Sequence, residues 1–67
     1  MTAKDKAQEL VDEFKQQLLT ITPNINRPIY QAKKFALIAV DEILSVVWYV
    51  PVDTEYWQEV KQEIENL

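Results

Sequence analysis

The sequence predicts an all-α protein made of three helices, for three reasons. The chain has no glycine, and tight β-hairpin turns depend on glycine, so a fold built from hairpins is disfavoured. Three prolines, Pro23, Pro28 and Pro51, divide the chain into three segments. Each segment repeats its apolar residues every three or four positions, which is the spacing of one face of a helix.

The size of the chain sets how that fold can be stable. With 67 residues we expect a single small domain over 1–67. Apolar burial would supply about 105 kcal/mol, and ordering the chain would cost about 100 kcal/mol. The chain has no cysteine and no histidine, so disulfides and the usual zinc sites add nothing. Tight helix packing and self-association remain, and we therefore expect a homodimer.

The first helix is predicted over residues 3–19. Thr2 followed by Asp5 has the spacing of a capping box, in which two side chains satisfy free backbone groups at a helix start. The apolar stripe of this helix consists of Ala7, Leu10, Val11, Phe14, Leu18 and Ile21. Pro23 and the two asparagines of the segment TITPNINRP then predict a loop.

The second helix is predicted over residues 28–47, with Pro28 in its first turn. Its apolar positions cover more than half of the circumference, so we expect it to be the central helix, with the first and third packed against it. The two acids within it, Asp41 and Glu42, are adjacent and diverge by about 100° on a helix. They cannot share a proton or a metal ion within one chain, and we expect them on a solvated stripe with Lys34 and Ser45. A carboxylate site completed by a second subunit is the alternative.

The same two acids bear on membrane insertion. The apolar residues from Phe35 to Val52 favour insertion by about 3–6 kcal/mol in total, and each central acid opposes it by about 2.5–3.5 kcal/mol. The gain and the cost nearly cancel, and Pro51 adds a break. We therefore expect no membrane association.

The third helix is predicted over residues 54–66, capped by Asp53 or Thr54. Its narrow apolar seam consists of Trp57, Val60, Ile64 and Leu67. Its C-terminal end carries Glu63 and Glu65, which are unfavourable at the negative end of the helix dipole. We expect these acids to face a group of bases at the start of the second helix, within one subunit or across a dimer: Arg27, Lys33 and Lys34.

Residues 46–52, VVWYVPV, are predicted to be a helix end followed by an apolar loop. A short strand that pairs with its copy across a dimer axis is the alternative. Four of the seven aromatic residues lie in or just after this segment. Tryptophan and tyrosine are enriched at protein interfaces, which makes the region a candidate interface, and a corner of the core with Trp57 inward is the other interpretation. The candidate interface residues are Val47, Trp48, Tyr49, Val50, Val52, Tyr56 and Trp57.

Charge and composition narrow the function classes. The net charge is −4, and the acids near the aromatic residues have the wrong sign for nucleic acid. Without histidine or cysteine, and with diverging carboxylates, the sequence offers no catalytic, metal-binding or cofactor-binding residues. We expect a cytoplasmic, non-enzymatic module that binds itself and another, unidentified protein. A small transcriptional or nucleic-acid-associated regulator is the alternative.

Three blocks of the sequence resemble a group of short, uncharacterised proteins from gut anaerobic bacteria and their phages and prophages. The blocks are AQELVDEFK at 7–15, AKKFALIAVDEIL at 32–44 and YWQEVKQEIENL at 56–67. Members of the group have a polar linker after the second block, where this chain has SVVWYVPVD. No activity or functional residue comes with the resemblance, which implies only a prophage-encoded accessory role.

Overall fold

The computed structural model describes residues 2–67, which form three α-helices: α1 (Ala3–Ile21), α2 (Pro28–Val47) and α3 (Pro51–Glu65). These residues contain no β-strand, and the all-α prediction is confirmed. Both α1 and α3 pack against α2, as predicted, but α1 and α3 also pack against each other. The three helices therefore share one core, and α2 is not enclosed between the other two.

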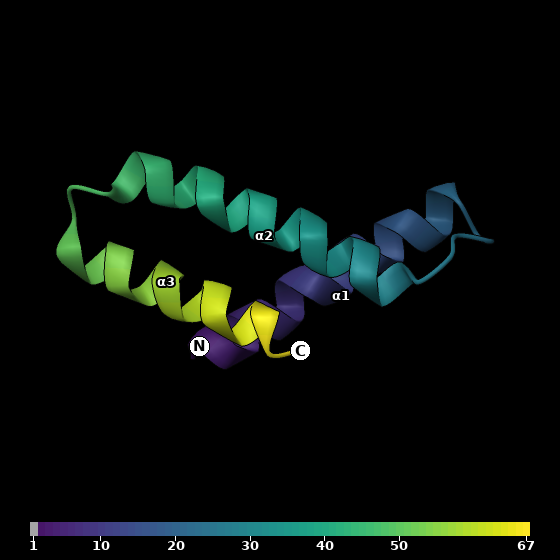
Figure 1. Cartoon of the computed structure of the whole chain (residues 1–67), viewed down its shortest axis with the longest axis horizontal. Coiled ribbons are helices and arrows are strands. Elements are labelled where there is room, and N and C mark those ends of the chain that lie inside the picture. The colour runs from purple at the N-terminus through teal and green to yellow at the C-terminus, as the bar shows by residue number, and fades with distance from the viewer. Residues whose placement is uncertain (1) are drawn as a thin grey trace.

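The helices are staggered along the long axis of the molecule (Figure 1). The α2–α3 turn lies at one end, where α1 does not reach, and the α1–α2 loop lies at the other end, beyond the last turn of α3. The molecule measures 41 × 20 × 16 Å. Its accessible surface is 4812 Å², whereas a compact monomer of this mass exposes about 4,400 Å². All three helices overlap only in the middle of the molecule.

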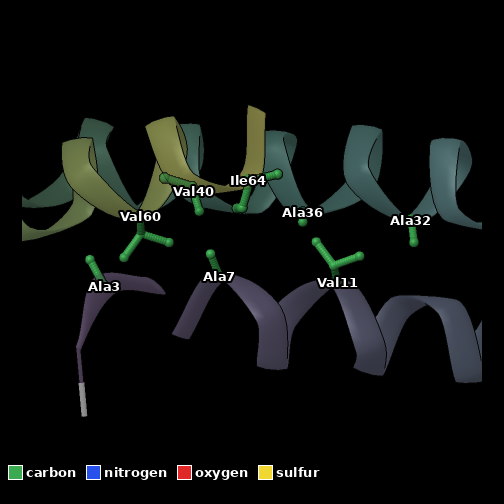
Figure 2. Packing of buried hydrophobic residues seen from close by; sticks show 8 residues of the cluster. All are labelled: Ala3, Ala7, Val11, Ala32, Ala36, Val40, Val60 and Ile64. Atoms are coloured by element: carbon green, nitrogen blue, oxygen red, sulfur yellow. The ribbon is translucent and has the colours of Figure 1, made fainter. Parts of the chain in front are cut away.

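The core lies in this middle part. It consists of Ala3, Ala7 and Val11 of α1, Ala32, Ala36 and Val40 of α2, and Val60 and Ile64 of α3. Figure 2 shows the α1 side chains pointing toward those of α2 and α3, with Ala3 facing Val60. Half of the buried residues are alanines, so the helices approach closely around few large side chains.

The predicted capping box begins α1. The backbone N–H of Asp5 donates to Thr2 Oγ1 (3.2 Å), and the backbone N–H of Thr2 donates to Asp5 Oδ2 (3.4 Å). The helix runs two residues beyond the predicted end, to Ile21. It stops there because Pro23 disfavours the helical conformation for the residue before it. That residue, Thr22, has φ −134°.

The second helix has the predicted bounds, with Pro28 as its first residue. Arg27 before it adopts the left-handed conformation (φ 55°, ψ 60°), and its side chain makes no capping hydrogen bond. Among the described residues, Arg27 is the one with a positive φ angle. Because the left-handed region crowds the Cβ atom, α2 begins with local backbone strain.

The third helix begins three residues earlier than predicted. Pro51 is its first residue and Val50 precedes it as the cap, without a side-chain capping bond. The prediction of Asp53 or Thr54 as the cap is therefore wrong, since proline is favoured at the first position of a helix and here begins one. The strand alternative for 46–52 is also wrong, because Val46 and Val47 end α2 while Pro51 and Val52 begin α3.

Candidate functional site

Four large apolar side chains lie exposed where α2 turns into α3. They are Val46, Trp48, Tyr49 and Val52, each with 66–75% of its surface exposed. We call this group the aromatic end. Solvent-exposed apolar side chains that gather in one place commonly mark contact sites, whereas single exposed ones are ordinary.

The local sequence explains why these side chains stay exposed. α2 ends at Val47, and the turn is closed by the Val50 N–H donating to the Val47 carbonyl (2.9 Å). Thr54 Oγ1 donates to the same carbonyl (2.9 Å), so the first turn of α3 is tied to the end of α2. α1 begins opposite the second half of α3, with Ala3 facing Val60 (Figure 2), and it does not reach the α2–α3 turn (Figure 1).

The seven predicted interface residues divide into two groups. Trp48, Tyr49 and Val52 are exposed, and the rings of Trp48 and Tyr49 meet edge to face with centroids 6.0 Å apart. The other four are half-buried: Val47, Val50, Tyr56 and Trp57. The rings of Tyr56 and Trp57 meet edge to face at 5.3 Å and pack against the core. The predicted cluster therefore has two parts. Tyr56 and Trp57 on α3 form a corner of the core, and Trp48 and Tyr49 at the turn form an exposed surface.

The acids of α2 lie on the solvated stripe that the sequence predicts. Asp41, Glu42, Lys34 and Ser45 are all exposed. Asp41 Oδ1 also forms an ion pair across to α3, 3.0 Å from Lys61 Nζ. The hydrogen bond that Lys61 donates to Asp41, together with the negative charge of Asp41, raises the pKa of Lys61 above the ordinary 10.5. Sequence reasoning missed this pair, because it depends on how α2 and α3 are aligned.

The bases at the start of α2 have different contacts from one another. Lys33 Nζ donates to the backbone carbonyl of Glu65 (3.4 Å), so it reaches the C-terminal end of α3 as predicted. Arg27 and Lys34 instead lie over the ring of Tyr30, at 4.8 and 5.6 Å from its centroid. Cations over an aromatic face are attracted by its quadrupole. Within one subunit, the predicted contact is therefore made by Lys33 alone, and it is made with the helix backbone.

The charges are segregated along the sequence between residues 14 and 59. Residues 14–40 contain no acid and four bases: Lys15, Arg27, Lys33 and Lys34. Residues 41–59 contain no base and five acids: Asp41, Glu42, Asp53, Glu55 and Glu59. The first range includes the α1–α2 loop and the second includes the α2–α3 turn, which lie at opposite ends of the long axis (Figure 1). This separation of bases from acids can be found in the sequence, but the net charge of −4 alone does not reveal it.

We call the α1–α2 loop, with the helix turns that flank it, the basic end. Its exposed apolar side chains are Ile21, Ile29 and Tyr30. The molecule therefore carries an acidic aromatic end and a basic end, each built from two helices.

The rest of the described surface shows little that resembles a chemical site. A shallow depression is lined by Glu13, Phe14, Gln16 and Gln17, all from α1. Across residues 2–67 no three carboxylates gather as metal ligands, and no polar side-chain atom is buried without a partner. None of the three helices combines the length and the apolar character needed to cross a membrane.

Comparison with models of protein families, with curated proteins and with solved structures finds no match to this chain.

Proposed function

We propose that this protein is a non-enzymatic interaction module that binds another protein through its aromatic end. The exposure of Trp48 and Tyr49 beside Val46 and Val52, at the end of the molecule that α1 leaves uncovered, carries the proposal. Tryptophan and tyrosine dominate the binding energy of protein interfaces because each buries a large area at little cost in side-chain entropy.

The turn that holds these rings supports the proposal. The Thr54 hydroxyl and the Val50 N–H both bind the Val47 carbonyl, and this fixes α3 against the end of α2. A surface that is ordered before binding loses less conformational entropy when a partner covers it. The aromatic end therefore suits recognition of a folded surface.

The remaining parts of the proposal come from the sequence. A chain without histidine and cysteine lacks the commonest catalytic and metal-binding side chains, and the absence of cysteine suits a reducing cytoplasm. The resemblance to short phage and prophage proteins motivates an accessory role in that setting. We propose no cofactor.

A photo-cross-linking experiment tests the aromatic end as the contact surface. A benzophenone amino acid replaces Trp48 in one variant and Gln8 in a control, and both are produced in the native host and irradiated. Gln8 is exposed like Trp48 but lies on the first half of α1, outside both ends of the molecule. We expect a discrete adduct, identifiable by mass spectrometry, from position 48. Adducts of equal yield and pattern from both positions, or none from position 48, would contradict the proposal.

The basic end supports a second candidate, a small nucleic-acid-associated regulator. Arg27 and Lys34 flank the exposed ring of Tyr30, and no acid lies in residues 14–40. Basic side chains neutralise phosphates and an exposed ring can stack on a base. Fluorescence anisotropy with a random single-stranded and a random duplex oligonucleotide, at low and high salt, tests this candidate. Binding that falls steeply with salt and is lost in Arg27→Glu would favour it over the first.

A further inference from the structure

We infer that the partner of the aromatic end is the basic end of a second copy of this chain, in a closed antiparallel pair. The inference rests on the proposed function, since it names what covers the aromatic end.

Charge complementarity between the two ends carries the orientation. All charged side chains from residue 41 to residue 59, the range that includes the aromatic end, are acids. All charged side chains from residue 14 to residue 40, the range that includes the basic end, are bases. Two copies aligned in parallel would place acid beside acid and base beside base. Two antiparallel copies place the acidic end of each over the basic end of the other, so both contacts attract. Such complementarity steers encounter and rejects the wrong orientation.

The dimensions of the molecule favour side-by-side contact over end-to-end contact. Each partner in a stable complex buries about 800 Å². An end face of the molecule measures 20 × 16 Å, which provides less than half of that area, whereas a side face measures 41 × 20 Å. End-to-end contact between unlike ends would also leave open ends and continue into a filament.

An apolar seam runs along the side that such a pair needs. Phe35, Ile38 and Val46 are exposed and lie within one quarter of the circumference of α2. Tyr49, two residues past the end of the helix, is exposed as well. Because α2 spans most of the long axis, this row connects the basic end to the aromatic end (Figure 1). We assign it as the seam on which α2 of one copy meets α2 of the other.

The pair has a two-fold axis across the middle of α2, which makes the contact isologous and closed. One acid, Glu42, lies in the seam between Ile38 and Val46. Glu42 lies four to five residues past the middle of α2, so in the antiparallel pair it faces the helix turn that carries Lys33 and Lys34 of the second copy. Opposite charges attract, and Glu42→Gln should therefore loosen the pair.

Paired charge reversals test the inference. One variant carries Arg27→Glu and Lys34→Glu, and the other carries Glu55→Lys and Glu59→Lys. All four side chains are exposed, and none of them is in the core. We expect each variant alone to associate at least tenfold more weakly than the natural chain, because its two ends then have the same sign. An equimolar mixture should regain association, as a heterodimer, in sedimentation at micromolar concentration.

A matched control separates charge position from net charge. Asp12→Lys with Glu13→Lys changes the net charge as much as the second variant does, from exposed positions on α1. This control should associate as the natural chain does. Far-ultraviolet circular dichroism of each variant checks that the helices are retained, and association of the natural chain should weaken as salt increases.

A spin-label experiment tests the orientation. A nitroxide on Asn24→Cys, in the α1–α2 loop, is mixed with ¹⁵N-labelled natural chain. The antiparallel pair predicts broadening of the indole N–H signals of Trp48, in the α2–α3 turn, and of Trp57, in the first half of α3. Broadening confined to residues near the loop would show a parallel pair and overturn the inference.

Failure of the inference differs from failure of the proposed function. A natural chain that stays monomeric at every concentration overturns the antiparallel pair. If its position-48 cross-link then leads to a different protein, the aromatic end remains the contact surface. If position 48 gives no adduct either, both proposals are wrong. Salt-sensitive binding of an oligonucleotide at the basic end, without self-association, also overturns the pair.

Discussion

The middle of the molecule and its aromatic end use side chains in opposite ways. In the middle, all three helices meet and four of the eight buried residues are alanines. At the aromatic end only α2 and α3 are present, and the large side chains of Trp48 and Tyr49 are mostly exposed. The small residues let the helices approach closely, while the large ones contribute little to burial. The fold therefore depends on a few residues in the middle, whereas the proposed contact with a partner uses different residues.

The largest expected effect tests whether the middle alone holds the fold. Ile64 in the core is fully buried, whereas Ile21 at the C-terminal end of α1 is 77% exposed. Ile64→Ala should lower the free energy of unfolding by about 2–5 kcal/mol, which approaches the whole stability of so small a domain. Ile21→Ala, the same chemical change, should stay within about 0.5 kcal/mol. Chemical denaturation of both variants measures this, and equal losses would remove the distinction between middle and end.

Overpacking the alanine core should have the next largest effect. Ala7 is fully buried and points toward α2 and α3 (Figure 2). Ala7→Leu should destabilise by about 1–3 kcal/mol, because the added atoms push the helices apart. The neighbouring Gln8 is exposed, and Gln8→Leu is the control, expected to change stability by less than about 0.5 kcal/mol. A stable Ala7→Leu variant would show that the middle is not closely packed.

The aromatic end should depend on a polar link where the middle depends on packing. Thr54→Val keeps the shape of the side chain but removes the hydrogen bond to the Val47 carbonyl, and should cost about 0.5–1.5 kcal/mol. Tryptophan fluorescence during denaturation reports the change, since both tryptophans lie close to this turn. Thr22→Val, at an exposed threonine outside the turn, should change little. An unchanged Thr54→Val variant would mean that the turn is held by other contacts.

The smallest expected effect is a pH dependence from the ion pair between Asp41 and Lys61. Asp41 raises the pKa of Lys61 above its ordinary value of 10.5, so the pair stabilises the fold below that pH. The stabilisation is lost as the pH rises through the raised pKa. Thermal denaturation should therefore favour the natural chain slightly over Asp41→Asn at pH 7 and not at strongly alkaline pH. Asp12→Asn is the control, and a difference that persisted at high pH would exclude the ion pair as the cause.

Much of the fold could be predicted because the signals are local. The capping box at Thr2 and the prolines Pro23 and Pro28 fix the start of α1 and the bounds of α2 to within a few residues. A proline such as Pro51 can either end a helix or begin one. Interpreting Pro51 as a helix break placed the predicted start of α3 three residues too late. Periodicity identified the buried faces of α1 and α3, but not that of α2, whose apolar positions surround most of the helix and include the exposed Phe35 and Val46. It could not show the stagger of the helices, which arises from packing between them.

The candidate site could be predicted in part for the same reason. The concentration of aromatic residues after Val46 is visible in the sequence, and it points to the segment that carries the exposed rings of Trp48 and Tyr49. Which of them remain exposed depends on where α1 begins relative to α3, so Trp48 and Trp57 could not be told apart. The Asp41–Lys61 pair likewise needs the alignment of two helices. The charge segregation was available from the sequence, but only by following the charges along the chain.

If the basic end forms the proposed pair, Arg27 combines a cost to the fold with a contribution to binding at a single residue. Its left-handed backbone is a conformation that glycine adopts without cost, yet this chain has no glycine at all. Replacement by glycine would relieve the backbone and at the same time delete a charge of the basic end. In the antiparallel pair, that variant would fold more stably as a monomer and pair more weakly. A residue that is poor for the isolated fold and good for the assembly is what selection for binding would leave behind.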